Sequence, residues 1–131
     1  MKTIDEVIAE MYAQVSFERG ERHGLDRQRE IFAPNARVVR VTDDGVFEFT
    51  LDEYRRDFER MKMVSFWEGE LWRQTFLVGD VATVLSAYET RRERAGEMIT
   101  RGVNSIQMFQ RGGDWWISAM IWRREGKSVR P

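Results

Sequence analysis

The first hydrophobic positions of the chain repeat with the period of an α-helix. Between residues 4 and 15 they are spaced three and four residues apart, which places them on one helix face. Thr3, with Glu6 three positions later, has the pattern of a capping box at the start of this helix. We therefore predict a first helix that ends near Gly20. Its apolar stripe consists of Ile4, Val7, Ile8, Met11, Tyr12 and Val15.

Two further helices are predicted in the first half of the chain. A short helix is expected from Leu25 to Phe32, because Pro34 disfavours helical geometry in the residue before it. Thr50 and Glu53 form a second capping pattern, and the apolar residues that follow keep helical spacing until about Met63. The sequence thus predicts three helices, all before residue 65.

The remaining apolar runs are typical of β-strands. Residues 36–41 and 46–49 are rich in β-branched and aromatic side chains and flank an Asp-Asp-Gly turn, so they indicate a strand pair. After residue 65, turns containing glycine separate four longer strands. The order of elements predicts one α+β domain over residues 1–131. The four long strands are expected at 66–78, 81–92, 98–111 and 115–124.

The last hairpin is apolar on both faces. A tight turn at Gly112-Gly113 with a constant register divides its side chains into two sets, because side chains alternate along a strand. One set has a few polar groups among apolar ones and is expected to line a ligand cavity. It pairs Gln107 with Ser118, Ser105 with Met120 and Val103 with Trp122. The other set pairs Met108 with Ile117, Ile106 with Ala119, Asn104 with Ile121 and Gln110 with Trp115.

The second set is too apolar to be left in water. Each large apolar side chain withdrawn from water contributes roughly 1.5 to 3 kcal/mol, so an exposed face of this kind would also invite aggregation. We expect the outer face to pack on a second copy of the chain, as a twofold dimer. The alternative is a sheet curled so tightly that its own helices and termini cover both sides.

Composition narrows the range of partners. The chain has 131 residues, 42% of them hydrophobic and 33% charged, and its formal net charge of -1 lacks the basic excess needed for nucleic acid. The first fifteen residues contain acidic side chains and no uninterrupted apolar run, unlike a signal peptide, and no stretch is long enough for a membrane span. We therefore expect a cytoplasmic protein that binds neither nucleic acid nor membrane.

Three charged or titratable residues are candidates for catalysis. Arg40 could clamp a carboxylate or enolate, or it could be the structural partner of an acidic residue such as Glu89. Glu89 could be a general base if its strand turns it inward, or it could lie at the rim in a salt bridge. His23 could act as acid or base at the cavity mouth, or it could be a solvated loop residue.

The expected ligand-binding residues are mainly apolar or neutral. Tyr12 lies on the apolar stripe of the first helix, and its hydroxyl would need a partner in the cavity. Ser105, Gln107, Met120 and Trp122 come from the cavity side of the last hairpin. No metal cluster, phosphate-binding glycine loop or nucleophile triad is recognisable. We expect neither metal nor cofactor, so any catalysis would be acid-base or electrostatic.

The order of elements and the ending GVNSIQMF...WWISAMIWRRE resemble the nuclear transport factor 2-like superfamily, in particular its SnoaL-like, ketosteroid-isomerase-like branch. The resemblance covers Ile4 to about Glu125. It implies a cone-shaped α+β fold, in which a strongly curved, mixed but mainly antiparallel sheet wraps around three N-terminal helices and encloses a pocket. Members are often dimers, and they include isomerases, polyketide cyclases, dehydratases, epoxide hydrolases and binding modules.

The resemblance does not extend to the catalytic residues of the ketosteroid isomerases. Ketosteroid isomerases use an Asp base with a Tyr and a neutral Asp as oxyanion donors. The base position falls on Arg40, which does not accept a proton at neutral pH, and the neutral Asp falls on Gln107, which does not titrate. The Tyr position falls near Tyr12 or Ser16. Isomerase chemistry of that type is therefore not expected.

Three functions follow from this sequence. The first is a dimeric protein that binds a small apolar or aromatic molecule, which could carry an anionic group. The second is an enzyme without metal, of the cyclase, isomerase or dehydratase type. It would use Glu89 or His23 as base, with Arg40, Tyr12 or Gln107 stabilising an oxyanion. The third is a subunit whose outer sheet face meets a different protein.

Overall fold

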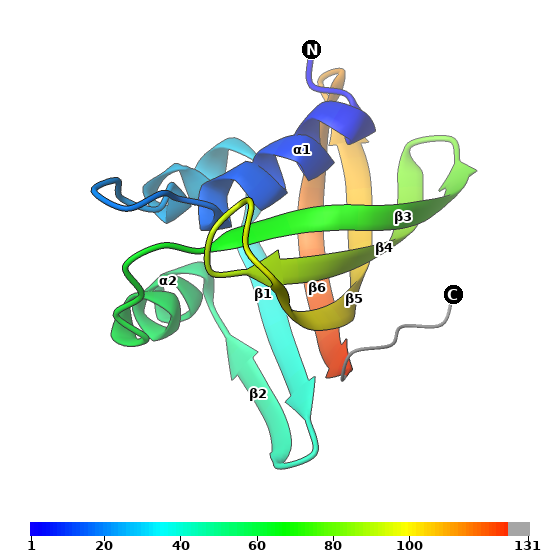
Figure 1. The fold of residues 1–131 in the computed structure, drawn as a ribbon. Helices are drawn as coiled ribbons and strands as arrows, with labels where there is room; N and C mark the ends of the chain where they lie inside the picture. The colour runs from blue at the N-terminus through cyan, green and yellow to red at the C-terminus, as the bar shows by residue number, and fades with distance from the viewer. Residues whose placement is uncertain (126–131) are drawn as a thin grey trace.

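Residues 1–125, the part of the chain that the computed structural model describes, form a six-stranded sheet with helices packed against it (Figure 1). This confirms the predicted α+β class and the predicted order of elements. The second helix is a short 3-10 helix. The elements are α1 (Ile4–Val15), η1 (Leu25–Glu30), β1 (Phe32–Thr42), β2 (Gly45–Phe49), α2 (Leu51–Arg60), β3 (Trp67–Val78), β4 (Val81–Arg91), β5 (Met98–Arg111) and β6 (Asp114–Glu125).

The sheet has the strand order β2-β1-β6-β5-β4-β3. Only β1 and β6 run parallel, and the other neighbouring pairs are antiparallel, as predicted for a mixed sheet. The helix α1 contacts β3 and β6, whereas α2 packs beside β1 and β2 (Figure 1). The sheet is not strongly curled, so the predicted degree of curvature is too high. In residues 1–125 no helix has the length and apolar character needed to cross a bilayer.

Side-chain caps fix the start of both α-helices. Thr50 Oγ1 accepts the Glu53 backbone N–H at 3.2 Å, and the Glu53 carboxylate accepts the Thr50 backbone N–H at 2.8 Å, which completes the predicted capping box. Thr3 Oγ1 likewise accepts the Glu6 backbone N–H at 3.1 Å. The Glu6 carboxylate contacts the Thr3 hydroxyl instead of its backbone, so only half of this predicted box forms.

The first helix ends at Val15 rather than near the predicted Gly20. Ser16 is extended, and the next residue, Phe17, pairs with Phe66 in an isolated antiparallel bridge. Two backbone hydrogen bonds of 2.8 and 2.9 Å join the two phenylalanines. The end of α1 is therefore tied to the start of β3.

The strand β1 begins earlier than predicted and contains Pro34. The 3-10 helix ends at Glu30, and Phe32 already pairs with β6. The pairing is irregular between Phe32 and Arg37, which accommodates a residue that has no backbone N–H to donate. The predicted helix boundary at Phe32 is therefore two residues too late.

A bulge at Ser118 changes the register of the last hairpin. The predicted pairing holds from the turn to Met108, which faces Ile117. Beyond that point Gln107 faces Ala119 instead of Ser118, because Ser118 is an extra residue on β6. The predicted pairs beyond Met108 are therefore wrong. The observed pairs are Ile106 with Met120, Ser105 with Ile121, Asn104 with Trp122 and Val103 with Arg123.

The face of the hairpin that was expected to lie outside is the inner face, and the bulge brings Met120 and Trp122 to this inner face as well, because side chains alternate along each strand. Four apolar residues that were expected on the outer face are buried in the core beneath the helices. They are Ile106, Met108, Trp115 and Ile117. Ile121 stays on the outer face, with 46% of its surface exposed. The inner face is therefore more apolar than predicted, and the outer face less so.

Candidate functional site

A cavity of about 730 Å³ lies between the inner face of the sheet and the helices. This volume is in the usual range for sites that hold a small organic molecule. Apolar side chains from the helices and the sheet form most of its wall, including Met11, Phe32, Phe58, Phe66, Met120 and Trp122. Its polar groups include Arg40, Asp57, Glu68, Tyr54, Tyr88 and Asn104.

Glu68 is an unpaired carboxyl group in this cavity. It lies on β3, where its backbone N–H donates to Ser16 Oγ at 3.0 Å and its backbone carbonyl accepts from the same hydroxyl at 3.3 Å. The carboxyl itself forms no hydrogen bond or ion pair within residues 1–125, and its burial raises the pKa of Glu68 to about 8. Near neutral pH this group can therefore either donate or accept a proton.

Three tyrosines share the electrostatic environment of Glu68. Burial is the main reason that the pKa values of Tyr12, Tyr54 and Tyr88 are raised, and the negative charge of Glu68 raises them further. All three hydroxyls are therefore held protonated at physiological pH. They can donate hydrogen bonds, but they cannot supply a phenolate base.

Arg40 is neutralised by a neighbouring acid. Its Nη1 lies 2.7 Å from Asp57 Oδ2 on α2, and its guanidinium packs over the rings of Phe47 and Phe49 at 5.1 and 5.3 Å. Arg40 therefore forms a structural ion pair, which was the predicted alternative to a ligand clamp, but its partner is Asp57 instead of Glu89. Because Arg40 and Asp57 both line the cavity, they present a dipole with little net charge to a ligand.

The wall beside Tyr88 leaves no room for a larger neighbour. A Cβ atom on Gly102 would lie 2.4 Å from the Tyr88 hydroxyl oxygen and 2.7 Å from the backbone oxygen of Arg123. Glycine at this position lets the hydroxyl end of the Tyr88 ring approach the backbone of β5 closely. The Tyr88 hydroxyl forms no hydrogen bond within residues 1–125, although the side chain is buried.

Glu89 lies on the opposite face from the cavity. Its carboxylate accepts hydrogen bonds from Arg91 Nη2 at 2.6 Å and Nε at 3.1 Å, and Arg91 also stacks over Trp67. Gly69 faces Glu89 on β3, and the Trp67 ring covers that glycine. The structure therefore places Glu89 in an ion pair outside the site.

His23 is packed rather than solvated. Its Nδ1 accepts the Leu25 backbone N–H at 3.1 Å, so the proton is on Nε2, which lies 3.0 Å from the Glu59 carboxylate. The ring meets Phe17 and Phe58 edge to face, at 6.5 and 5.4 Å between centroids. His23 does not line the cavity, and its contacts hold the loop after α1 against α2.

The five expected ligand-binding residues are divided by the Ser118 bulge. Met120 and Trp122 line the cavity. Ser105 and Gln107 lie on the outer face, where Gln107 Oε1 accepts a hydrogen bond from Thr83. Tyr12 lies behind the cavity wall, and it reaches the cavity through Asn104.

The sequence reasoning missed the polar residues of the cavity other than Arg40, and for two of them the sequence does contain a signal. Asn104 is a polar residue in the same alternating set as Ile106 and Met108, which is a signal that the sequence does contain. Glu68 is an acid between aromatic residues, and it shares the parity of Phe66. Both would have been found by asking which polar residues interrupt an apolar face.

Metal ligation is not indicated by the described side chains. Within residues 1–125 no three His, Asp or Glu side chains are grouped closely enough to hold a metal ion.

Comparison with known proteins identifies the fold. No protein-family model matches the chain. No curated protein matches it in sequence. Solved structures do match. An NTF-2-like protein of unknown function from Silicibacter pomeroyi superposes with a TM-score of 0.62 and 18% identity, over 93% of this chain and 92% of that chain.

Two neighbours have named activities. The hexachlorocyclohexane dehydrochlorinase LinA-type3 from Novosphingobium barchaimii has a TM-score of 0.68 and 12% identity, over 98% of this chain and 92% of that chain. The β subunit of a putative aromatic-ring-hydroxylating dioxygenase from Novosphingobium aromaticivorans has a TM-score of 0.67 and 13% identity, over 97% of this chain and 88% of that chain. The chain therefore has the nuclear transport factor 2-like fold. That fold is shared by enzymes and by proteins of unknown function, so the specific function remains to be proposed from the site.

The half-buried carboxyl group of Glu68 makes stability depend on pH. Because the pKa of Glu68 is raised in the folded state, the folded protein binds more protons than the unfolded chain between about pH 4.5 and 8. The free energy of unfolding therefore falls as pH rises through this window. We expect Glu68→Gln to remove that fall and to stabilise the protein at pH 8 by roughly 2–4 kcal/mol, with little effect at pH 4.

Urea denaturation at several pH values measures this effect. Glu48→Gln, on the exposed side of β2, is the matched control and should follow the wild type. A pH-independent effect of Glu68→Gln would show that the pKa of this carboxyl group is the same in the folded and unfolded states.

Proposed function

We propose that the protein binds a small, mainly apolar organic molecule in the cavity between the sheet and the helices. The observation that carries this proposal is the 730 Å³ cavity, whose wall combines apolar and aromatic side chains with polar and charged groups that can orient a guest. The ring of Trp122 lies 5.5 Å from that of Tyr54 in an edge arrangement, and both side chains line the cavity. They offer a flat aromatic ligand a surface for packing.

A ligand screen tests the proposal. Steroid-like, polyketide-like and aromatic-acid compounds are tested by thermal shift, because a ligand that binds only the folded state raises the melting temperature. We expect one class to stabilise the wild type, and Trp122→Ala to weaken its affinity by about tenfold or more, since a buried aromatic contact is lost.

The control is Trp116→Ala. Trp116 is on the same strand, but it lies on the side opposite to the cavity, beneath Lys2. Equal loss of affinity in both variants would place the ligand elsewhere. The absence of any stabilising compound from all three classes would count against a ligand cavity.

A second candidate function is acid-base catalysis on the same ligand, and Glu68 is the observation that favours it. A carboxyl group with a pKa near 8 can remove a proton from a bound substrate and return it within one turnover. The dehydrochlorinase among the structural neighbours is consistent with this idea, because its name describes removal of hydrogen chloride from a small hydrophobic substrate. Glu68 takes the role that the sequence had suggested for Glu89 or His23.

Substitution separates catalysis from binding. If Glu68 is the base, kcat/KM for a substrate found in the screen should rise with pH to a plateau above pH 8, because the carboxylate is the active form. Glu68→Gln should lower kcat by about 100-fold or more while affinity changes only a few-fold. Glu89→Gln should keep full turnover, since its carboxylate lies outside the cavity. The reverse pattern would restore Glu89 as the base.

We further propose that the outer sheet face forms a twofold dimer. In the observed register, apolar side chains are still exposed on this face, including Phe76 with 53% and Ile121 with 46% of their surface. Trp72, Leu85 and Val103 lie on the same face. Together these side chains give the outer face an apolar surface on which a second copy would pack.

Light scattering distinguishes a homodimer from a subunit of a mixed complex. We expect a species of twice 15.6 kDa, and Ile121→Arg should shift it to the monomer mass while the circular dichroism stays unchanged. A monomeric, poorly soluble wild type would favour a different protein partner instead. In that respect it would resemble the dioxygenase β subunit, which is named as part of a larger enzyme.

A further inference from the structure

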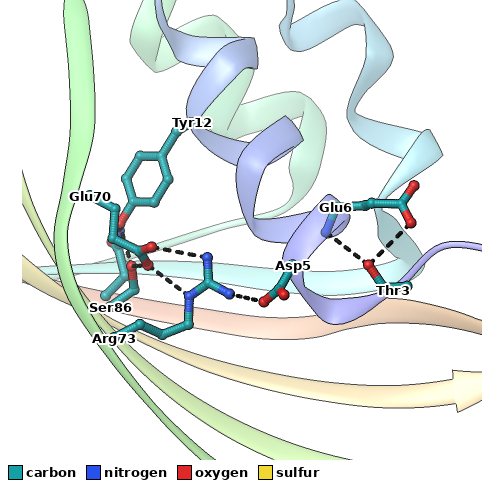
Figure 2. Close-up of polar contacts among 8 residues, drawn as sticks. Thr3, Asp5, Glu6, Tyr12, Glu70, Arg73 and Ser86 are labelled. Carbon is teal, nitrogen blue, oxygen red and sulfur yellow. Dashed lines mark hydrogen bonds and ion pairs between the residues drawn. The ribbon is translucent and has the colours of Figure 1, made fainter.

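A chain of hydrogen bonds runs from the cavity wall to the protein surface (Figure 2). Asn104 Nδ2 lies 3.1 Å from the Tyr12 hydroxyl, which lies 2.6 Å from Ser86 Oγ, and Ser86 lies 2.5 Å from Glu70 Oε2. Arg73 closes the chain with two bonds to the Glu70 carboxylate, of 2.9 and 3.0 Å. Four separate elements, α1, β3, β4 and β5, each contribute to this chain.

The direction of every hydrogen bond in the chain is fixed from its surface end. The Glu70 carboxylate, paired with Arg73, can only accept, so the Ser86 hydroxyl must donate to it. Ser86 has one hydroxyl proton, so its oxygen must accept the proton of Tyr12. The Tyr12 oxygen is then left as an acceptor.

This direction determines how the Asn104 amide is turned. Only the amino group of Asn104 can donate to the Tyr12 oxygen, so Nδ2 must face Tyr12. In the flipped amide, two oxygen atoms would meet at hydrogen-bond distance with no proton between them. The orientation of the amide therefore follows from the charge on Glu70, three hydrogen bonds away.

The carbonyl oxygen of Asn104 is left without a partner. Its side chain is only 4% exposed and lines the cavity beside Trp122, which it faces across the strand pair. Within residues 1–125 no group donates a hydrogen bond to Asn104 Oδ1. Asn104 Oδ1 is not fully enclosed by protein, so it stays accessible to a ligand that supplies the missing donor.

We propose that Asn104 is a hydrogen-bond acceptor that selects ligands with a hydroxyl or amino group over the corresponding carbonyl compounds, and that Ser86 is its positioning residue. This proposal rests on the proposed ligand cavity and names the chemical class that the cavity prefers. The sequence suggested that Tyr12 stabilises an oxyanion by donating a hydrogen bond, whereas this proposal places a hydrogen-bond acceptor in the cavity. The single proton of Tyr12 is already donated to Ser86 and is not available to a ligand.

Matched pairs of alcohols and ketones test the preference. The probes are 1-indanol with 1-indanone, 1-tetralol with 1-tetralone, and 9-fluorenol with 9-fluorenone, measured by calorimetry. Within each pair the apolar skeleton is the same, and only the alcohol can donate a hydrogen bond. For pairs that bind, we expect the wild type to prefer the alcohol by about three- to tenfold, the usual effect of one hydrogen bond.

Two variants at neighbouring positions assign the preference to Asn104. Asn104→Leu, which has a similar size but no acceptor, should bind alcohol and ketone about equally. Ser105→Ala is the matched control, because Ser105 is adjacent on β5 but lies on the outer face. It should keep the wild-type preference.

Ser86 variants test the positioning role. Ser86→Ala frees the Tyr12 proton, which can then point toward Asn104 and let the amide flip. We expect the alcohol preference to fall at least threefold through a gain in ketone affinity, and Ser86→Thr, which restores a hydroxyl, to recover it. A purely structural role of Ser86 would weaken both probes alike, so that result would overturn its assignment.

The remaining outcomes are also decisive. Binding of the pairs with no alcohol preference, or with a preference that survives in Asn104→Leu, would overturn the assignment of Asn104 while the ligand cavity still stands. If the wild type binds no member of any pair although the ligand screen is positive, the ligand cavity stands and the selection by Asn104 is overturned. If the screen is also negative, the proposed function fails and this inference fails with it.

Discussion

The extra residue at Ser118 is the constraint on which the cavity depends. A strand has a period of two, so a single inserted residue exchanges the faces of everything that follows it. The bulge allows Ile117, before it, and Met120 and Trp122, after it, to point to the same side. Without this insertion, the core packing of Ile117 and the cavity lining by Trp122 would be mutually exclusive. The hydroxyl of Ser118 donates to the Gln107 backbone oxygen at 3.2 Å, which helps to hold the strands together at the point of irregularity.

The cavity combines charges that are paired with charges that have no partner within residues 1–125, and Glu68 is one of the latter. Arg40 is paired with Asp57, and Glu70 is paired with Arg73, so these charges stabilise packing between elements and contribute little field to a ligand. Glu68 has no such partner within residues 1–125, and its burial raises its pKa to about 8. This contrast matters for the role of Glu68. Its pKa is raised by burial, and it lines a cavity with a volume suited to a ligand. Such a combination is typical of a functional group rather than a structural one.

Much of the fold could be predicted from the sequence, because its signals are local. The helical stripe after Thr3, the capping box at Thr50 and the glycine turns between strands each depend on residues a few positions apart, and each marks an element that forms. The candidate site was less predictable. Nothing in the local pattern around Ser118 distinguishes a bulge from regular alternation, so Ser105 and Gln107 were expected inside and Asn104 was overlooked. The partner of Arg40 depends on how α2 packs against β1, which no local pattern reveals.

The contact between Gly102 and Tyr88 limits how this cavity can be altered. Any side chain at position 102 would displace the Tyr88 ring, so this part of the wall cannot be reshaped by a single substitution. The neighbouring part of the wall on β6 is different, because Met120 is an unbranched side chain with several rotatable bonds. A lineage or an engineer that changes the size of the guest would therefore meet resistance at β4 and β5 and more freedom at β6. The cavity thus has a rigid part and an adjustable part on adjacent strands of one sheet.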